Sequence, residues 1–267
     1  MSRTKNPEIN LPYPLFDSHF HLDHMAQRGL DITDLWRRLR AAGLTGGLDV
    51  SVTEAGFEER RVRAVTLGGL HLSAGIHPSG CGSGRLDDRM DAVADQTSDT
   101  LVVAVGESGL DFYRDTVPED RQQEAFAAHL DLAAEKGLPI IVHNRNADDA
   151  VLAAIGGSPC RRGVFHCFSS DSSTARKALD LGFHVSFAGN LTYKASDEIR
   201  RAAAMIPDDR LLVETDAPFL PPQAVRGRTN HPGFIGYTLE VLAEIRGTAP
   251  EDLAARTRSN AASLFGI

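Results

Sequence analysis

The stretch Leu15-Phe-Asp-Ser-His-Phe-His-Leu-Asp23 decides between the two folds that the rest of the chain allows. It begins as a short apolar strand, and polar side chains that can bind metal follow directly. A doubly wound sheet usually has a glycine-rich, phosphate-binding turn after its first strand. This stretch contains no glycine, so it favours a barrel whose first strand delivers polar side chains to a site at its carboxyl end.

Eight short apolar stretches recur along the chain, with room for a helix between most neighbours. We expect strands over Leu15–Asp17, Gly46–Val52, Leu70–Ile76, Leu101–Gly106, Leu138–Val142, Gly163–Phe165, Phe183–Phe187 and Leu211–Thr215. Strands that alternate with helices in this way pair in parallel. The length of 267 residues is close to the ~250 typical of one such barrel. We therefore predict an α/β fold, a TIM (β/α)₈ barrel of the metal-dependent hydrolase type, with residues 15–267 as a single domain after an N-terminal extension of residues 1–14.

Helix signals fill the intervals between these strands. A left-handed C-cap is expected at Gly43, and Asp171 is the expected N-cap of a helix that starts at Ser172. Thr116 and Thr248 each begin a Thr-x-Pro-Glu sequence that predicts a capping box with proline in the first turn. One amphipathic face repeats with helical spacing at Ile32, Leu35, Trp36 and Leu39.

Composition excludes several classes of protein. The chain is 42% hydrophobic, which excludes disorder for most of its length, and its formal charge of −8 argues against a broad basic surface that grips nucleic acid. Apolar runs such as Leu101–Val105 are too short to cross a membrane. The three cysteines, Cys81, Cys160 and Cys167, form no Cys-x-x-Cys pair, which fits a reduced, cytoplasmic compartment better than a disulfide framework.

Six polar side chains stand where the predicted strands end: His19, His21, Glu107, His143, His166 and Asp216. In a barrel these carboxyl ends converge on one mouth. A single histidine at such a position is more often a satisfied, partly buried side chain than a ligand. Six candidates at five strand ends are hard to assemble by accident, and burying them without partners would be costly. The combination therefore predicts a metal site.

Side-chain alternation along strands supports this arrangement. Counting back by two places Val103 and Val105 on the same side as Glu107, and Ile141 and Val164 on the side of the two later histidines. The same count places Asp17 and Glu214 one layer deeper. These two carboxylates either hydrogen-bond the outer nitrogens of metal-bound imidazoles or pair with basic residues in the barrel floor.

Four imidazoles and two carboxylates are too many ligands for one tetrahedral ion and suit two divalent ions. We expect one ion on His19, His21 and Asp216, another on His143 and His166, and Glu107 bridging both. Such a centre is net positive and would attract a phosphate diester. It could activate a water for in-line attack at phosphorus, with Asp216 as the acceptor of its proton. Imidazole ligands favour Zn, Mn or Fe over Mg for tight binding.

Several segments together resemble the TatD family of metal-dependent deoxyribonucleases. They are Phe16-Asp-Ser-His-Phe-His-Leu22, Gly75-Ile-His-Pro78, Ala104-Val-Gly-Glu-Ser-Gly-Leu-Asp-Phe-Tyr-Arg114, Leu138-Pro-Ile-Ile-Val-His-Asn-Arg145, Gly163-Val-Phe-His-Cys-Phe-Ser169, Val213-Glu-Thr-Asp-Ala-Pro218 and Arg226-Gly-Arg-Thr-Asn230. The resemblance implies a TIM barrel and the same six ligands. It also implies a 3′→5′ exonuclease that prefers single-stranded DNA and works with two divalent ions, Mg, Mn or Zn. The chain departs from the family pattern at Ser79 and Gly80, and at Asn146 and His231, which bears on substrate contacts and not on hydrolysis.

Basic side chains in the loops after the strands are candidates for substrate binding. We expect Arg145 and Arg226 to contact substrate, because a guanidinium offers a bidentate fork for phosphate. His77 also follows a strand and either reaches a phosphate or packs in a turn. Lys194 and Arg228 are expected to be solvated surface charges. An aromatic pair, Phe112-Tyr113, is expected to pack a loop, although such rings can stack on bases.

Two other functions remain open from the sequence. The first is a hydrolase of amide, lactone or ester bonds in a small molecule, since related metal barrels catalyse such reactions. Many of those bridge their metals with a carboxylated lysine at the end of the fourth strand, where this chain has Glu107, which favours the nuclease. The second is a non-catalytic scaffold, which should have lost ligands, whereas all six candidates are present.

Overall fold

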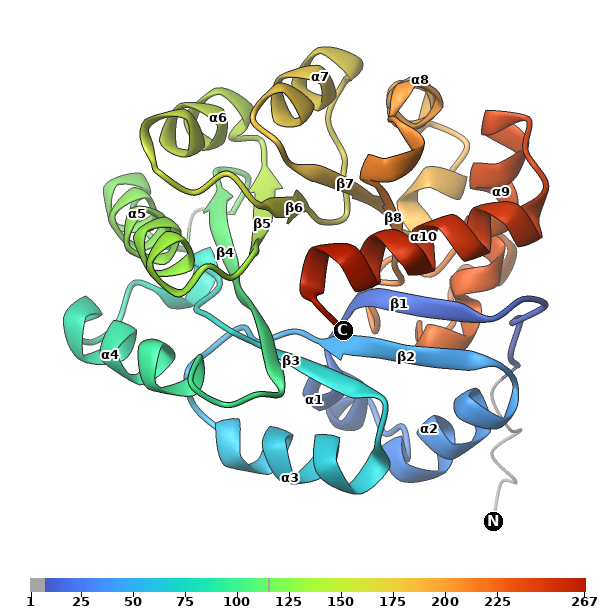
Figure 1. Ribbon diagram of the computed structural model, residues 1–267, viewed down its shortest axis with the longest axis horizontal. Helices are drawn as coiled ribbons and strands as arrows, with labels where there is room; N and C mark the ends of the chain where they lie inside the picture. The colour runs from blue at the N-terminus through green and yellow to red at the C-terminus, as the bar shows by residue number, and fades with distance from the viewer. Residues whose placement is uncertain (1–7, 115) are drawn as a thin grey trace.

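The computed structural model describes residues 8–114 and 116–267. It contains one eight-stranded sheet in the order β1 to β8, and every neighbouring pair is parallel (Figure 1). The strands are β1 (Leu15–Phe20), β2 (Leu44–Asp49), β3 (Leu70–Ala74), β4 (Val102–Asp111), β5 (Ile140–Arg145), β6 (Gly163–Phe165), β7 (His184–Phe187) and β8 (Leu211–Val213). A bridge between Phe20 and Ala217 joins the last strand to the first. The predicted TIM barrel is confirmed, and residues 1–7 of the predicted N-terminal extension lie outside the described residues.

Helices surround the barrel (Figure 1). They are α1 (Leu22–Gln27), α2 (Ile32–Ala41), α3 (Phe57–Leu67), α4 (Leu86–Gln96), α5 (Glu119–Lys136), α6 (Asp148–Gly157), α7 (Ser172–Asp180), α8 (Asp197–Met205), α9 (Ile235–Arg246) and α10 (Pro250–Phe265), with short 3₁₀ helices η1 (Pro78–Gly80), η2 (Gly189–Thr192), η3 (Asp208–Arg210), η4 (Gln223–Val225) and η5 (Pro232–Phe234). Within residues 8–114 and 116–267, no helix combines the length and apolar character needed to cross a membrane.

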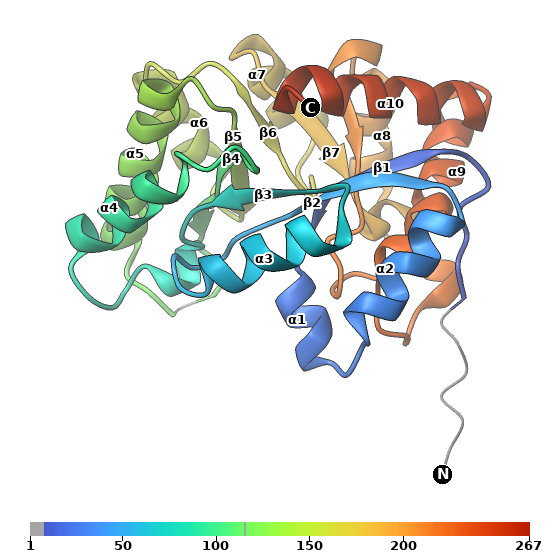
Figure 2. The ribbon, with the colours of Figure 1, turned by 60° about the horizontal axis from the view of Figure 1, so that its bottom comes forward.

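Helix α10 closes the amino end of the barrel. Its residues Leu264 and Phe265 belong to the cluster that fills the barrel interior, together with Phe16, Leu48 and Val164 from the strands. Side-chain hydrogen bonds also tie α10 to residues at the strand starts, since Arg258 donates to Pro14 O (2.7 Å) and Asn260 to Leu211 O (2.8 Å). Figure 2 shows α10 on one side of the barrel and α1 on the other. The opposite, carboxyl end is therefore the one left for a site.

Strand β4 is longer and less regular than the sequence suggests. It continues to Asp111, so Glu107 lies inside the strand and not at its end. Its pairing carries one extra residue against β3 near Val103 and another against β5 between Val105 and Ser108. Val103 faces the barrel interior as predicted, but Val105 packs in the outer core. Each extra residue reverses the side on which the following side chains lie. Because there are two of them between Val103 and Glu107, the predicted side for Glu107 is correct although that for Val105 is not.

The helix ends agree with the sequence in part. Asp171 caps α7 by accepting a hydrogen bond from Thr174 N (2.8 Å), as predicted. The capping boxes at Thr116 and Thr248 are wrong, because Pro118 and Ala249 occupy the N-cap positions and no side chain caps either helix. The C-cap of α2 is Ala42 and not Gly43.

Candidate metal centre

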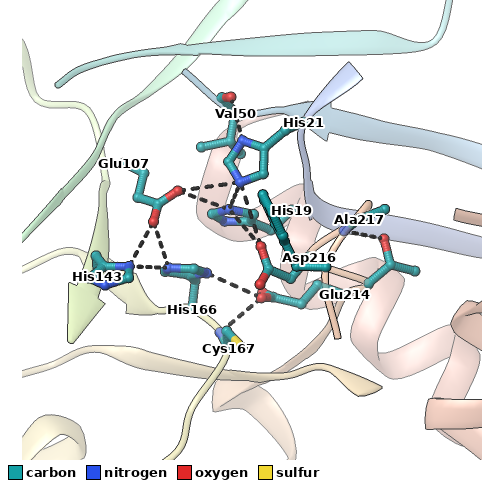
Figure 3. A network of polar contacts seen from close by, with 12 residues as sticks. His19, His21, Val50, Glu107, His143, His166, Cys167, Glu214, Asp216 and Ala217 are labelled. Atoms are coloured by element: carbon teal, nitrogen blue, oxygen red, sulfur yellow. Dashed lines mark hydrogen bonds and ion pairs between the residues drawn. The ribbon is translucent and has the colours of Figure 1, made fainter. Parts of the chain in front are cut away.

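The six predicted side chains meet at the carboxyl end of the barrel (Figure 3). His19 lies in β1 and His21 directly after it, whereas Glu107 comes from β4 and His143 from β5. The other two, His166 and Asp216, follow β6 and β8. All except His143 are buried, and His143 is partly buried. Residues that are nearly two hundred positions apart in the chain are therefore neighbours in one polar cluster.

One half of the cluster surrounds the Oε2 atom of Glu107. His19 Nε2 lies 3.3 Å from this oxygen and His21 Nε2 lies 3.5 Å from it. The two imidazole nitrogens are 3.2 Å apart. Asp216 Oδ1 completes this half, at 3.5 Å from His21 Nε2 and 3.8 Å from His19 Nε2.

The other half surrounds the Oε1 atom of the same carboxylate. His143 Nδ1 lies 2.8 Å from it and His166 Nε2 lies 3.1 Å from it, and these two nitrogens are 3.3 Å apart. His77, for which we expected either a phosphate contact or a packing role in a turn, also points here, with Nε2 at 3.4 Å from Oε1. Each oxygen of Glu107 thus serves a different group of imidazoles.

Polar partners lie on the far side of three of the four rings, those of His21, His166 and His143. His21 Nδ1 lies 2.9 Å from Val50 O, and a carbonyl only accepts, so this nitrogen carries the proton and Nε2 keeps a lone pair. His166 Nδ1 lies 3.3 Å from Glu214 Oε1, and His143 Nε2 lies 3.5 Å from Asp111 Oδ2. With a cation in place of the additional proton, the carboxylates on these far sides would accept the remaining ring protons and leave the lone pairs of His166 Nε2 and His143 Nδ1 directed at the cluster.

His77 has the opposite tautomer. Its Nδ1 accepts a hydrogen bond from the backbone N–H of Ser79 (3.0 Å), so the proton of the neutral ring lies on Nε2. Burial lowers the pKa of His77 to about 3, which keeps the ring neutral near pH 7. Its Nε2 is therefore a donor towards Glu107 and not a lone-pair ligand.

The donor set fits divalent metal ions. Ligand atoms about 2.0–2.1 Å from a tetrahedral ion are roughly 3.3 Å from one another. The donors around Glu107 Oε2 are 3.2–3.5 Å apart, and those around Oε1 are 2.8–3.3 Å apart. The buried group His19–His21–Glu107 satisfies the spacing for a shared ion. The first facing pair, His19 Nε2 and His21 Nε2, can share at most one proton, whereas a cation would give both a partner.

The deeper carboxylates have different roles. Glu214 Oε1 contacts His166 Nδ1 and also accepts the backbone N–H of Cys167 (2.8 Å), in line with the first of the two roles expected for it. Asp17 matches neither, because it accepts hydrogen bonds from the N–H and hydroxyl of Thr215 (3.0 and 2.6 Å). Burial raises the pKa of Asp17 to about 8.

The electrostatics of the cluster favour ionised carboxylates. Burial by itself would raise the pKa of Glu107, but His166 and the other imidazoles hold it well below its usual range. Burial opposes ionisation of Asp216 as well, yet its contact with His21 lowers the pKa. Burial disfavours the imidazolium of His166, but Glu107 and Glu214 on either side raise its pKa well above the usual value. The site attracts a proton where a cation would bind.

Two backbone features hold these side chains in place. Asp216 has a left-handed conformation (φ 54°) and its N–H donates to His19 O (2.9 Å), which ties the two metal-competent segments together. Gly109 pairs with His143 across β4 and β5, and a Cβ there would lie 1.9 Å from His143 O. Only glycine permits this approach.

Comparison with known proteins identifies the family. The family model for TatD related DNases matches residues 16–266. The chain belongs to the TatD family. It is 37% identical to the uncharacterized metal-dependent hydrolase YcfH of Escherichia coli (95% of this chain and 96% of the relative), and 33% identical to the 3′-5′ ssDNA/RNA exonuclease TatD of Klebsiella pneumoniae (95% of each).

Solved structures agree with this assignment. The TatD homologue YjjV from Escherichia coli superimposes with a TM-score of 0.89 at 28% identity, covering 95% of this chain and 98% of that one. A structure from an organophosphate-hydrolysis study on a lactonase template, at 17% identity and a TM-score of 0.64 with 94% and 95% covered, shares the fold alone. Together with the relatives, these findings make this TatD-family protein a metal-dependent hydrolase.

The candidate metal centre of this TatD-family hydrolase contributes His21, Glu107, His143, His166 and Asp216 to the lining of a cavity of about 900 Å³. Arg145 lines the cavity with its guanidinium over the Tyr113 ring (4.7 Å). Arg226 is exposed over the ring of Tyr193 (4.3 Å), which itself lines the cavity. Arg228 instead pairs with Glu8 on the surface (2.6 Å).

Several residues that line the cavity are not among those predicted from the sequence. Asp111 was not selected, although it accepts hydrogen bonds from the backbone N–H groups of Tyr113 and Arg114 (3.1 and 3.0 Å) and lies beside His143. Its place four positions after Glu107 offered a signal that a longer β4 would have revealed. Arg28 and Phe219 also line the cavity, and neither belongs to a pattern that marks a site.

Proposed function

We propose that the chain is a two-metal nuclease that releases nucleotides from the 3′ end of single-stranded DNA. The observation that carries the proposal is that the two oxygens of Glu107 contact different pairs of histidines. Oε2 faces His19 and His21, and Oε1 faces His143 and His166. A bridging carboxylate of this kind suits a pair of ions about 3.5–4 Å apart, the spacing used for in-line displacement at phosphorus. The name of the Klebsiella relative supports the substrate and the direction.

In this proposal His19, His21 and Asp216 hold one ion, His143 and His166 hold the other, and Glu107 contacts both. When bound, divalent ions such as Mg, Mn or Zn would lower the pKa of water and neutralise phosphate charge. His77 then serves as a phosphate contact, because its Nε2–H points towards Glu107 Oε1, beside the second group of imidazoles.

Asp216 is the residue best placed to accept a proton from the attacking water. Its Oδ1 lies beside the His21 nitrogen and its side chain remains 12% exposed towards the cavity. A lowered pKa keeps this carboxylate ionised near neutral pH, so it can act as a base. Arg145 and Arg226, at the rim, would hold phosphates further along the strand.

The proposal is tested by digestion of end-labelled single-stranded DNA with Mg²⁺, Mn²⁺ or Zn²⁺ added to metal-free protein. We expect nucleotides to be released from the 3′ end, and Asp216→Ala to abolish release. Asp209→Ala is the matched control, since this exposed aspartate lies in η3 at the amino end of β8. Activity on small esters or lactones with none on DNA would contradict the nuclease and support the small-molecule hydrolase.

A further inference from the structure

Large apolar side chains are exposed at few places in the described part of the chain, and two of them are aromatic rings, Phe219 in the cavity lining and Tyr113 under Arg145, which also lines the cavity. Tyr113 is 64% exposed and Phe219 is 38% exposed. The other exposed large hydrophobic residues are Val62, Val65 and Ile267. Each ring lies under a guanidinium, Arg145 over Tyr113 (4.7 Å) and Arg28 over Phe219 (5.0 Å). The proposed chemistry uses Arg145 for phosphate but gives no role to Arg28 or to either ring.

The Phe219–Arg28 pair lies next to the first half of the cluster. Phe219 follows Asp216 by three residues and its N–H donates to Asp216 O (2.9 Å). Its ring is in edge contact with His21 (6.0 Å between centroids) and with His24 (5.7 Å). A flat group stacked on Phe219 would therefore lie one ring away from the ligands of the first ion.

The Tyr113–Arg145 pair lies next to the second half. Tyr113 N donates to Asp111 Oδ1, and the other oxygen of that carboxylate is 3.5 Å from His143 Nε2. The barrel topology fixes the relation between the two pairs: strands β4 and β5 lie across the barrel from β8 and β1. The two rings consequently flank the metal centre from opposite sides of the mouth.

Both guanidiniums retain donors for an anion. Arg28 donates through Nη1 to Pro218 O (3.3 Å), and within residues 8–114 and 116–267 its other nitrogens have no hydrogen-bond partner. The same holds for every nitrogen of the Arg145 guanidinium within those ranges. An aromatic face beside an arginine combines stacking for a base with a fork for the adjoining phosphate.

We infer that Phe219–Arg28 and Tyr113–Arg145 are two base-and-phosphate anchors that hold a single strand across the metal centre, one anchor on each side of the scissile phosphate. The inference rests on the proposed nuclease activity and adds the means of substrate selection. A base inside a duplex has both faces stacked on its neighbours and cannot use such a ring. Selection for single strands would then come from unstacked bases and not from phosphate charge.

The experiment compares two single-stranded DNA substrates that differ only in whether the two nucleotides at the 3′ end carry bases. We expect the parent protein, with Mn²⁺, to cleave the complete substrate with a kcat/KM at least about fivefold higher than that for the abasic one, the effect of one base–aromatic stack. Phe219→Ala and Tyr113→Ala, made separately, should each reduce this ratio towards one. Phe219→Trp, which keeps a stacking surface, should retain it.

Val65→Ala is the matched control, because Val65 is as exposed as Tyr113 (64%) but lies on α3, whereas the Tyr113 ring lies under Arg145, which lines the cavity. It should leave the ratio unchanged. Binding of the complete strand to the Asp216→Ala protein, followed by fluorescence anisotropy, should weaken by the same factor when Phe219 is replaced.

The outcomes separate the two hypotheses. Equal cleavage of both substrates by the parent, or alanine variants that match Val65→Ala, would overturn the anchors and leave the nuclease intact. A parent protein that cleaves neither substrate with any of the three metals would overturn the nuclease and the anchors together.

Discussion

Glu214 Oε1 lies 3.3 Å from His166 Nδ1 and accepts the backbone N–H of Cys167, so one buried carboxylate orients both the imidazole and the backbone that follows it. In a metal-bound site, this contact would hold the ring proton on His166 Nδ1 and leave the lone pair of Nε2 directed at the ion beside Glu107. Replacing a carboxylate that hydrogen-bonds a metal-binding histidine typically lowers the metal affinity by about 10–100-fold.

The first prediction follows from that contact. Glu214→Gln should weaken Zn²⁺ or Mn²⁺ binding by about 10–100-fold, because the amide no longer holds a full negative charge against the Nδ1 proton. Competition with a chelator measures the affinity. The exposed Glu198→Gln should bind metal like the parent, and an unchanged affinity in Glu214→Gln would contradict the assigned role.

The second prediction concerns the bridge. Glu107→Gln should lower the metal content from two ions per chain to one or none, because a single amide oxygen cannot serve both halves of the cluster. Elemental analysis after dialysis against Mn²⁺ gives the ratio. Two ions retained in this variant would show that the halves do not depend on a shared ligand.

The third prediction tests the close approach of β4 and β5. Gly109→Ala places a Cβ 1.9 Å from His143 O at φ +150°, so we expect a loss of about 1–3 kcal/mol in the free energy of unfolding and weaker metal binding. Gly156 lies in α6, and a Cβ added there would meet open space. Gly156→Ala should therefore raise the free energy of unfolding by about 0–1 kcal/mol, the helix preference for alanine over glycine. Urea unfolding compares the two variants, and equal effects would exclude a steric cause.

The fourth prediction concerns acid stability. His129 is buried, its Nδ1 donates to Ala125 O (2.7 Å) and its Nε2 accepts Ile76 N–H (3.0 Å). Burial lowers its pKa to about 4 from an ordinary 6.5, so the unfolded chain takes up this proton first as the pH falls. The neutral His129 therefore makes its full contribution to the free energy of unfolding above pH 6.5. About 3 kcal/mol of this free energy is lost as the pH falls from 6.5 to 4.

His129→Leu removes this titration. The variant should be less stable than the parent at pH 7, because two hydrogen bonds are lost, and the difference should shrink as the pH approaches 4. Urea unfolding in the presence of a chelator, at several pH values, measures both proteins. Differences that stay constant with pH would contradict a neutral, buried His129. His184 and His231, with pKa values also lowered by burial to about 4, should leave residual acid sensitivity in the variant.

The sequence by itself determined the barrel and its six polar side chains. Apolar stretches alternate with helix signals, and parallel strands end at one mouth, so His19, His143 and Asp216 are brought together by topology alone. Local patterns sufficed there because each strand carries its own hydrophobic signal. The N-cap residues could not be predicted as well from the sequence. Thr116 and Thr248 lie just before the N-cap positions, which Pro118 and Ala249 occupy.

Only the tertiary structure decided the finer arrangement. The two extra residues in β4 depend on pairing with β3 and β5, so the alternation count misplaced Val105. The tautomer of His77 depends on a backbone N–H in η1, and Asp17 bonds to Thr215, nearly two hundred residues away. The Phe219–Arg28 pair forms because β8 closes onto β1. Contacts between side chains on separate strands leave no trace in local sequence periodicity, because they are set by how the strands register when the barrel closes.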